Sequence, residues 1–240
     1  MKPLVGLIAL AACGGDPVDR PLVFGGDRSI TLDVPETLVD GQRYPLLLVL
    51  HGYTVTGFIQ QAYLGAAQLA TRSEAFVLAP DGLLDLEDKP FWNADEVCCD
   101  YDQLAPDDVG YLGGLLDDVA EAWPVDRDAV FAVGHGNGGH MAYRLACERA
   151  DALAGIAVIA AGTGFDAAEC APSQPVNVVH LHGTADLEFE LAGGGPFQQS
   201  PGAPGAVESV SRWADHGGCS RERTPRGAID VDDVVDGAET

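Results

Sequence analysis

Short apolar runs along the chain are separated by longer segments in which apolar residues recur at helical spacing. Residues 45–50 are almost wholly apolar and end at His51, which is typical of a central strand covered by helices on both faces. Alternating apolar and polar positions at 29–34 predict a half-buried strand. Further strands are expected at 76–79, 130–133, 156–160 and 176–181.

Helices are predicted between these strands, at 58–71, 109–123, 139–149 and 206–216. Regular alternation of strands and helices indicates the α/β class, with a mostly parallel central sheet and helices on both faces. We find no internal repeat and no second domain. Residues 83–107 form a polar stretch too long for an ordinary connection, so we interpret them as a functional excursion.

The acidic composition narrows the possible partners. The 240 residues include 37 Asp and Glu against 13 Lys and Arg, a formal net charge of −24. Such a surface repels phosphate backbones, and we expect no nucleic-acid partner. We favour a solvated acidic surface that maintains solubility over adaptation to a salty exterior or a cationic partner.

The first residues resemble an export signal. Lys2 precedes an apolar run at 4–12 that is too short to span a bilayer. The run ends in Leu10-Ala11-Ala12-Cys13, which resembles a bacterial lipoprotein signal. We therefore predict a signal peptide at 1–12 and a domain at 13–240 that begins at a lipidated Cys13. This protein would be extracellular or in the cell envelope and would contact a membrane only through its lipid anchor.

The remaining cysteines agree with export. They are Cys98, Cys99, Cys147, Cys170 and Cys219, and in an oxidising compartment we expect them to form disulfides. Because five is an odd number, one thiol lacks a partner in this set. Paired C-x-x-C spacing is missing, so the cysteines do not predict a zinc site.

The segment Gly134-His135-Gly136-Asn137-Gly138 lies between a predicted buried strand and a helix. A nucleophile elbow, G-x-S-x-G, belongs at such a junction. Its outer glycines match, but glycine stands at the nucleophile position, Gly136. The backbone N–H groups of Tyr53 and Asn137 are the expected oxyanion donors. Asp186, in a loop after the next two strands, is the expected triad acid.

Short stretches in a fixed order resemble a known family. They are Leu50-His51-Gly52-Tyr53, Ala79-Pro80-Asp81-Gly82, Trp92-Asn93, Cys98-Cys99, Asp107-Asp108-Val109-Gly110-Tyr111, Val133-Gly134-His135, Asn137-Gly138-Gly139, Tyr143-Arg144-Leu145-Ala146-Cys147, His182-Gly183-Thr184-Ala185-Asp186 and Arg212-Trp213. Through them the chain resembles the polyhydroxybutyrate depolymerase and feruloyl esterase family, of the α/β-hydrolase fold, over nearly its whole length.

The resemblance implies an exported serine carboxylic-ester hydrolase without cofactors. In such an enzyme a serine attacks the ester carbonyl and a histidine relays its proton. The implied substrates are hydroxyalkanoate polyesters, or feruloyl and acetyl esters of plant polysaccharides.

Two departures from the family pattern predict that this chain is inactive or nearly so. Gly136 has no oxygen with which to form an acyl-enzyme. The family carries its catalytic histidine in a Gly-Gly-His segment, whereas only His216 follows Asp186, at the end of a predicted helix. We therefore expect a chain that is incomplete at its C-terminus, with the last strand and the catalytic histidine beyond Thr240.

Two alternatives remain open at this level. One is a non-catalytic lipoprotein that binds esters or polysaccharides. The other is a metal-dependent hydrolase using His180, His182 and Asp186, although satisfied core histidines are the simpler interpretation and we expect no metal. The resemblance implies that His51 shapes the oxyanion loop, and Asp107-Asp108 before a helix is explained by N-capping.

Overall fold

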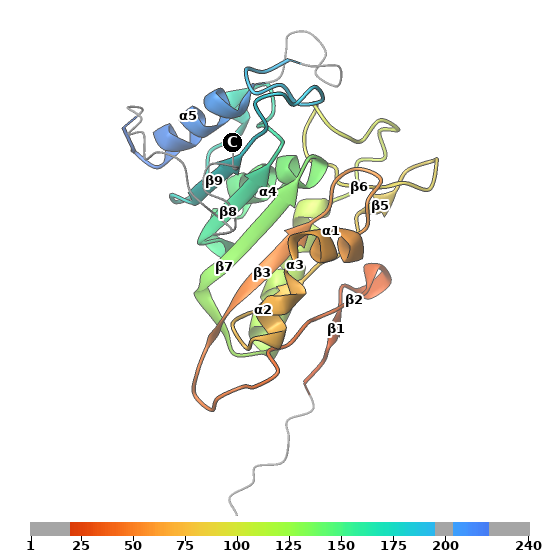
Figure 1. Ribbon diagram of the computed structural model, residues 1–240, viewed down its shortest axis with the longest axis vertical. Helices are drawn as coiled ribbons and strands as arrows, with labels where there is room; N and C mark the ends of the chain where they lie inside the picture. The colour runs from red at the N-terminus through yellow and green to blue at the C-terminus, as the bar shows by residue number, and fades with distance from the viewer. Residues whose placement is uncertain (1–19, 195–203, 221–240) are drawn as a thin grey trace, which may run out of the picture.

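A computed structural model describes residues 20–194 and 204–220. Its centre is a five-stranded sheet in the order β4-β3-β7-β8-β9, and all neighbouring pairs are parallel (Figure 1). The strands are β3 (Tyr44–Leu50), β4 (Phe76–Leu78), β7 (Val125–His135), β8 (Gly155–Ile159) and β9 (Asn177–Leu181). The predicted α/β class and parallel sheet are confirmed. The predicted Cys13 and the tail from residue 221 lie outside the described residues.

β7 occupies the middle of this sheet. Gly134, near its carboxyl end, pairs with Leu50 of β3 on one side and with Val158 of β8 on the other. Ligand sites of open parallel sheets form at the carboxyl ends of the strands. The register therefore places the Gly134–Gly138 segment at the centre of that edge.

In the described residues five α-helices pack around the sheet: α1 (Gly57–Leu64), α2 (Ala67–Thr71), α3 (Asp108–Ala122), α4 (Asn137–Glu148) and α5 (Ala206–His216). Alternate residues of the strands face opposite sides. Val49 and Val77 pack with Ala66 and Ala70 beside α1 and α2.

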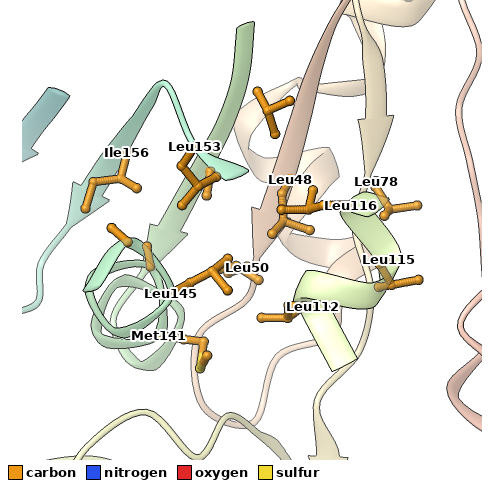
Figure 2. Packing of buried hydrophobic residues seen from close by; sticks show 14 of the residues in the cluster. Leu48, Leu50, Leu78, Leu112, Leu115, Leu116, Met141, Leu145, Leu153 and Ile156 are labelled. Carbon is orange, nitrogen blue, oxygen red and sulfur yellow. The ribbon is translucent and has the colours of Figure 1, made fainter. Parts of the chain in front are cut away.

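The larger core lies on the other face of the sheet. There the leucines of α3, together with Met141 and Leu145 of α4, form one cluster with Leu48, Leu50 and Ile156 of the strands (Figure 2). Trp213 of α5 belongs to the same cluster. Because all these side chains are buried, this layer carries most of the apolar burial that stabilises the fold.

Part of the first face carries no helix among the described residues. Figure 1 shows α1 and α2 over β3 and β4, while the near face of β7, β8 and β9 is open. There Phe131, Val179 and Leu181 are 41%, 58% and 51% exposed. The expectation of helices on both faces therefore holds for only part of the sheet.

Two predicted elements differ from the structure. The helix expected at 58–71 is divided into α1 and α2, because the chain turns at Gly65 with a left-handed φ of 64°. The strand expected at 29–34 is reduced to β2 (Ile30–Thr31), which pairs with β1 (Val23–Phe24), and Asp33 makes only an isolated bridge to Val77. The remaining described elements are a short antiparallel pair, β5 (Leu83–Leu84) and β6 (Pro90–Phe91), and three 3₁₀ helices: η1 (Gly26–Arg28), η2 (Ala150–Ala152) and η3 (Ala167–Glu169).

The described cysteines form two disulfides, Cys98–Cys99 and Cys147–Cys170, and leave an exposed Cys219 without a bond to another described cysteine. Cys147–Cys170 ties α4 to the segment before β9. In residues 20–194 and 204–220, we find no helix with the length and apolarity needed to cross a bilayer.

Candidate active site

Gly136 forms the turn between β7 and α4. Its φ of 53° and ψ of −119° define a conformation that costs most residues roughly 1–3 kcal/mol and that glycine adopts readily. The Gly136 N–H donates to the carbonyl of Ile159 on β8 (2.9 Å), and the Gly136 carbonyl accepts from Gly139 and His140 at the start of the helix. The turn is thus fixed from both sides.

The flanking glycines allow close packing. A Cβ on Gly134 would lie 2.0 Å from the carbonyl oxygen of Gly138, and a Cβ on Gly138 would lie 2.2 Å from that of Leu50. By contrast, a Cβ on Gly136 would meet no atom within 4 Å. A side chain at position 136 would therefore extend into open space, as a nucleophile at an elbow must.

That space belongs to a cavity of about 310 Å³. It brings together Gly136, Tyr53, Asn137 and Asp186, which come from three separate parts of the chain. The other lining residues are Gly52, Thr54, Val55, Cys98, Cys99, Tyr101, His135, Ala160, Glu188 and Phe189. The residues predicted as nucleophile position, oxyanion donors and acid thus share one cavity, although their catalytic roles remain predictions.

The backbone N–H groups of Tyr53 and Asn137 suit an oxyanion site. Among the described residues neither group donates to a protein acceptor, whereas the next N–H groups, of Thr54 and Val55, donate to Pro90 and Gly52. Asn137 is the first residue of α4, where N–H groups have no partner within the helix. Both groups are therefore free to bind a developing negative charge.

His51 fixes the loop that carries Tyr53. Its Nε2 accepts a hydrogen bond from the Gly82 N–H (2.8 Å), so its Nδ1 carries the proton and donates to the Gly52 carbonyl (2.8 Å). Burial lowers the pKa of this ring. The neutral imidazole thus has a structural role, because both nitrogens are occupied inside the protein.

Three side chains on one face of α4 attach the excursion at 83–107 to the elbow. Asn137 accepts from the Trp92 N–H (2.6 Å) and donates to the Trp92 carbonyl (2.9 Å). His140 Nδ1 lies 2.8 Å from Asp95, and Arg144 donates to the Asn93 carbonyl (2.7 Å). The spacing of 137, 140 and 144 places all three on one helical stripe. The excursion therefore forms one wall of the cavity.

Asp186 is held by its own loop. Its Oδ1 accepts from the backbone N–H groups of Glu188 (2.9 Å) and Phe189 (3.0 Å), and its Oδ2 lies 3.9 Å from His182 Nε2. These contacts fix the carboxylate of a residue that lines the cavity. An acid in this place can orient an imidazole, which is the role of the acid in a triad.

Solved esterases have the same architecture. A carboxylesterase from Mesorhizobium loti superposes with a TM-score of 0.56 at 19% identity, over 82% of this chain and 85% of that one. The Bacillus cereus carboxylesterase gives a TM-score of 0.53 at 22% identity, over 78% of each chain. The chain has the α/β-hydrolase fold.

Sequence relatives of this chain carry esterase names. Feruloyl esterase D of Neurospora crassa is 28% identical over 202 residues, 77% of this chain and 64% of the relative. Feruloyl esterase C of Emericella nidulans is 27% identical over 230 residues, which are 88% of this chain and 77% of the relative. The Nocardia uniformis protein NocK, which carries an esterase name, is 32% identical over 145 residues, which are 59% of this chain and 40% of the relative.

These relatives confirm the resemblance to feruloyl esterases that the motifs indicated. No protein-family model matches the chain. The chain spans 40%, 64% and 63% of the lengths of the first three curated relatives.

None of the chain's six histidines, all of them in the described residues, is placed as a triad base. His135 is the one histidine that lines the 310 Å³ cavity at Gly136, called the elbow cavity below. Its ring stacks on Tyr63, with the ring centroids 6.2 Å apart. His216, at the end of α5, packs edge-on against Trp213. It lines a separate cavity of about 570 Å³ along α4 and α5, which contains neither Gly136 nor Asp186.

His180 and His182 belong to a partly buried hydrogen-bond chain. His182 Nε2 lies 2.6 Å from the Phe189 carbonyl, so it donates, and His182 Nδ1 accepts from His180 Nε2 (3.0 Å). His180 Nδ1 in turn accepts from the Tyr143 hydroxyl (2.7 Å). Across the described part of the chain, no three His, Cys, Asp or Glu side chains are grouped as metal ligands. The structure therefore offers no support for the metal-dependent alternative.

Sequence reasoning missed the apolar wall of the cavity. The Tyr53 hydroxyl donates to Asp85 (2.6 Å). The rings of Tyr53 and Tyr101 pack edge-on, with their centroids 5.5 Å apart. Phe189 packs with the Cys98–Cys99 disulfide on the same side. The length of the polar excursion was the one signal of this wall, and it did not indicate which residues turn inward.

We predict that Asn137→Leu lowers the free energy of unfolding by about 2–4 kcal/mol, because it leaves the buried N–H and C=O of Trp92 without partners. Urea unfolding measures the change. The matched control is Asn177→Leu, which removes an exposed amide that donates to the Ala154 carbonyl. It should cost less than about 1 kcal/mol, and equal losses in the two variants would contradict the buried bridge.

We also predict that the protein loses stability as the pH falls from about 6.5 toward 4. The pKa of His180 is lowered to about 4, chiefly by burial and further by the neighbouring His182 and His140. Because the unfolded ring binds protons from about pH 6.5 downward, acid favours the unfolded chain. Thermal melts between pH 7 and 4 should show a smaller decline for His180→Gln. Equal declines in wild type and His180→Gln would contradict this assignment.

Proposed function

We propose that the chain is an exported carboxylic-ester hydrolase of the feruloyl esterase type whose turnover is lost or reduced to a trace. One observation carries the proposal: Gly136, at the strand-to-helix turn of an α/β-hydrolase fold, lines one cavity with Asp186 and with Tyr53 and Asn137, whose backbone N–H groups have no protein acceptor in the described part of the chain. The similarity to feruloyl esterases supports an ester ligand.

The lining favours an apolar acyl group. Tyr53, Tyr101 and Phe189 present aromatic surface, and the disulfide adds a further apolar contact. Hydroxyalkanoate polyesters and feruloyl or acetyl esters of polysaccharides are the substrate classes that we propose. Ester cleavage of this kind proceeds through an acyl-enzyme and requires no metal or other cofactor.

The chemistry explains the loss of turnover. Without a hydroxyl at position 136, no acyl-enzyme forms. Oxyanion donors and substrate binding alone sustain roughly 10³–10⁴-fold catalysis over water in a serine protease that has lost a triad member. Trace hydrolysis is therefore the upper limit that we expect of this chain.

A second candidate function is ester or polysaccharide binding without turnover. It is favoured by the same cavity, which keeps its oxyanion donors and its walls although the nucleophile position is glycine. Tight binding of an ester with no release of its alcohol would distinguish this function from slow hydrolysis.

The test is acylation by p-nitrophenyl acetate, followed by mass spectrometry of the intact protein. Gly136→Ser should accept one acetyl group on the introduced hydroxyl, slowly because no histidine lies in position as a base. The unmodified chain should remain unlabelled and hydrolyse the ester at nearly the buffer rate. Since a side chain at this φ costs roughly 1–3 kcal/mol, the variant should also melt at a lower temperature.

Gly114→Ser is the matched control for this acylation, because a Cβ on Gly114 of α3 also meets no atom within 4 Å. It should remain unlabelled. Equal labelling of both serine variants, or rapid hydrolysis by the unmodified chain, would refute the elbow as the ester site.

Export through a lipid anchor at Cys13 is a separate part of the proposal. It rests on the Leu10-Ala11-Ala12-Cys13 sequence after a basic and apolar start. In a bacterial host we expect the chain to incorporate an alkyne-labelled fatty acid, and Cys13→Ser to abolish the label. Persistent labelling of the variant would show that Cys13 is not the lipidated residue.

A further inference from the structure

We propose that the elbow cavity binds free carboxylates, the acids released by ester hydrolysis, in preference to their esters. This inference rests on the proposed function, because it assumes that the cavity at Gly136 is the ester-recognition site. It adds a ligand class and an order of affinities that ester recognition alone does not imply.

The first step is the shape of the site. In an elbow with a serine, the hydroxymethyl group occupies the space beside the oxyanion donors. Here a Cβ on Gly136 would meet no atom within 4 Å, so that space is open. A carboxylate can therefore direct one oxygen to the N–H groups of Tyr53 and Asn137 and place the other above Gly136.

The second step is the strength of the contact. A carboxylate carries a full negative charge, whereas an ester carbonyl oxygen carries only a partial one. Hydrogen bonds to an ionised acceptor are roughly twice as strong as those between neutral groups. The two N–H groups have no protein acceptor among the described residues, and one of them begins the twelve-residue helix α4. The helix dipole adds to this preference for an anion.

The third step is the charge that opposes binding. Asp186 and Glu188 line the same cavity, and no lysine or arginine does so in the described structure. The net charge of −24 adds to the repulsion. The charge of Asp186 is partly compensated by two backbone N–H groups at 2.9 and 3.0 Å. Because the attraction comes from neutral dipoles at contact and the repulsion acts over a longer range, added salt should strengthen the binding of the acid.

The fourth step is the size of the ligand. A volume of about 310 Å³ lies at the lower end of the range for small-molecule sites. It suits the acyl part of one ester unit, and the aromatic wall of Tyr53, Tyr101 and Phe189 suits an aryl group. An aryl-propenoic acid is therefore the probe of choice.

The experiment is calorimetric titration of the whole chain with 4-hydroxy-3-methoxycinnamate, its methyl ester and its primary amide. The three probes share the aryl group and differ only in charge and in the carbonyl substituent. We expect the acid to bind about tenfold more tightly than the ester or the amide, and its affinity to rise between 20 and 300 mM salt, as screening of the repulsion requires.

Gly136→Ser should lower the affinity for the acid about tenfold by filling the open space, while changing the affinity for the ester less than about threefold. Gly114→Ser is the control and should change neither. The salt dependence of the unmodified chain provides a second test that holds even if the Gly136 variant does not fold.

The failures of the two proposals are distinguishable. Binding of all three probes with equal affinity and no salt-dependent gain for the acid would overturn the carboxylate preference and leave the ester site intact. Binding of none of them would overturn both proposals.

Discussion

The turn at Gly136 is the constraint on which the rest of the site depends. It connects the central strand to α4 at a positive φ, and it is tied to β8 through the hydrogen bond from Gly136 to Ile159. Close approach at Gly134 and Gly138 brings the start of the helix against the end of β3. This packing places the first N–H of α4 beside the loop that carries Tyr53. The predicted oxyanion donors, the cavity and the open space therefore arise from one local geometry, and that geometry does not require a serine.

Helix α4 also organises the polar parts of the molecule. Asn137, His140 and Arg144 hold the excursion along one stripe, while Met141 and Leu145 of the same helix face the core. Burial of the apolar face thus fixes the position of the polar one. The walls of the cavity are consequently as well determined as the core, although they come from a segment with little regular secondary structure. A site held in this way keeps its shape when the nucleophile is lost, because no wall depends on the side chain at position 136.

The sequence predicted the sheet and the elbow because both rest on local patterns. Apolar runs marked the central strands, and glycine spacing marked the turn. β7 extends back to Val125, beyond the predicted 130–133, because three charged residues at 126–128 hide its start. The break at Gly65 was missed because the apolar pattern continues across it. The amide bridge from Asn137 to Trp92 and the histidine chain to Phe189 connect residues that only the fold brings together. No sequence spacing could have shown them.

The central claim is that the N–H groups of Tyr53 and Asn137, beside Gly136, form the ligand site of this chain. Amide chemical shifts recorded by NMR during titration with 4-hydroxy-3-methoxycinnamate test it most directly, since they report on each N–H separately. We predict the largest shifts at Tyr53, Gly136 and Asn137. Shifts confined to the larger cavity along α4 and α5, around Tyr143 and Trp213, would contradict the claim and place the ligand elsewhere in the molecule.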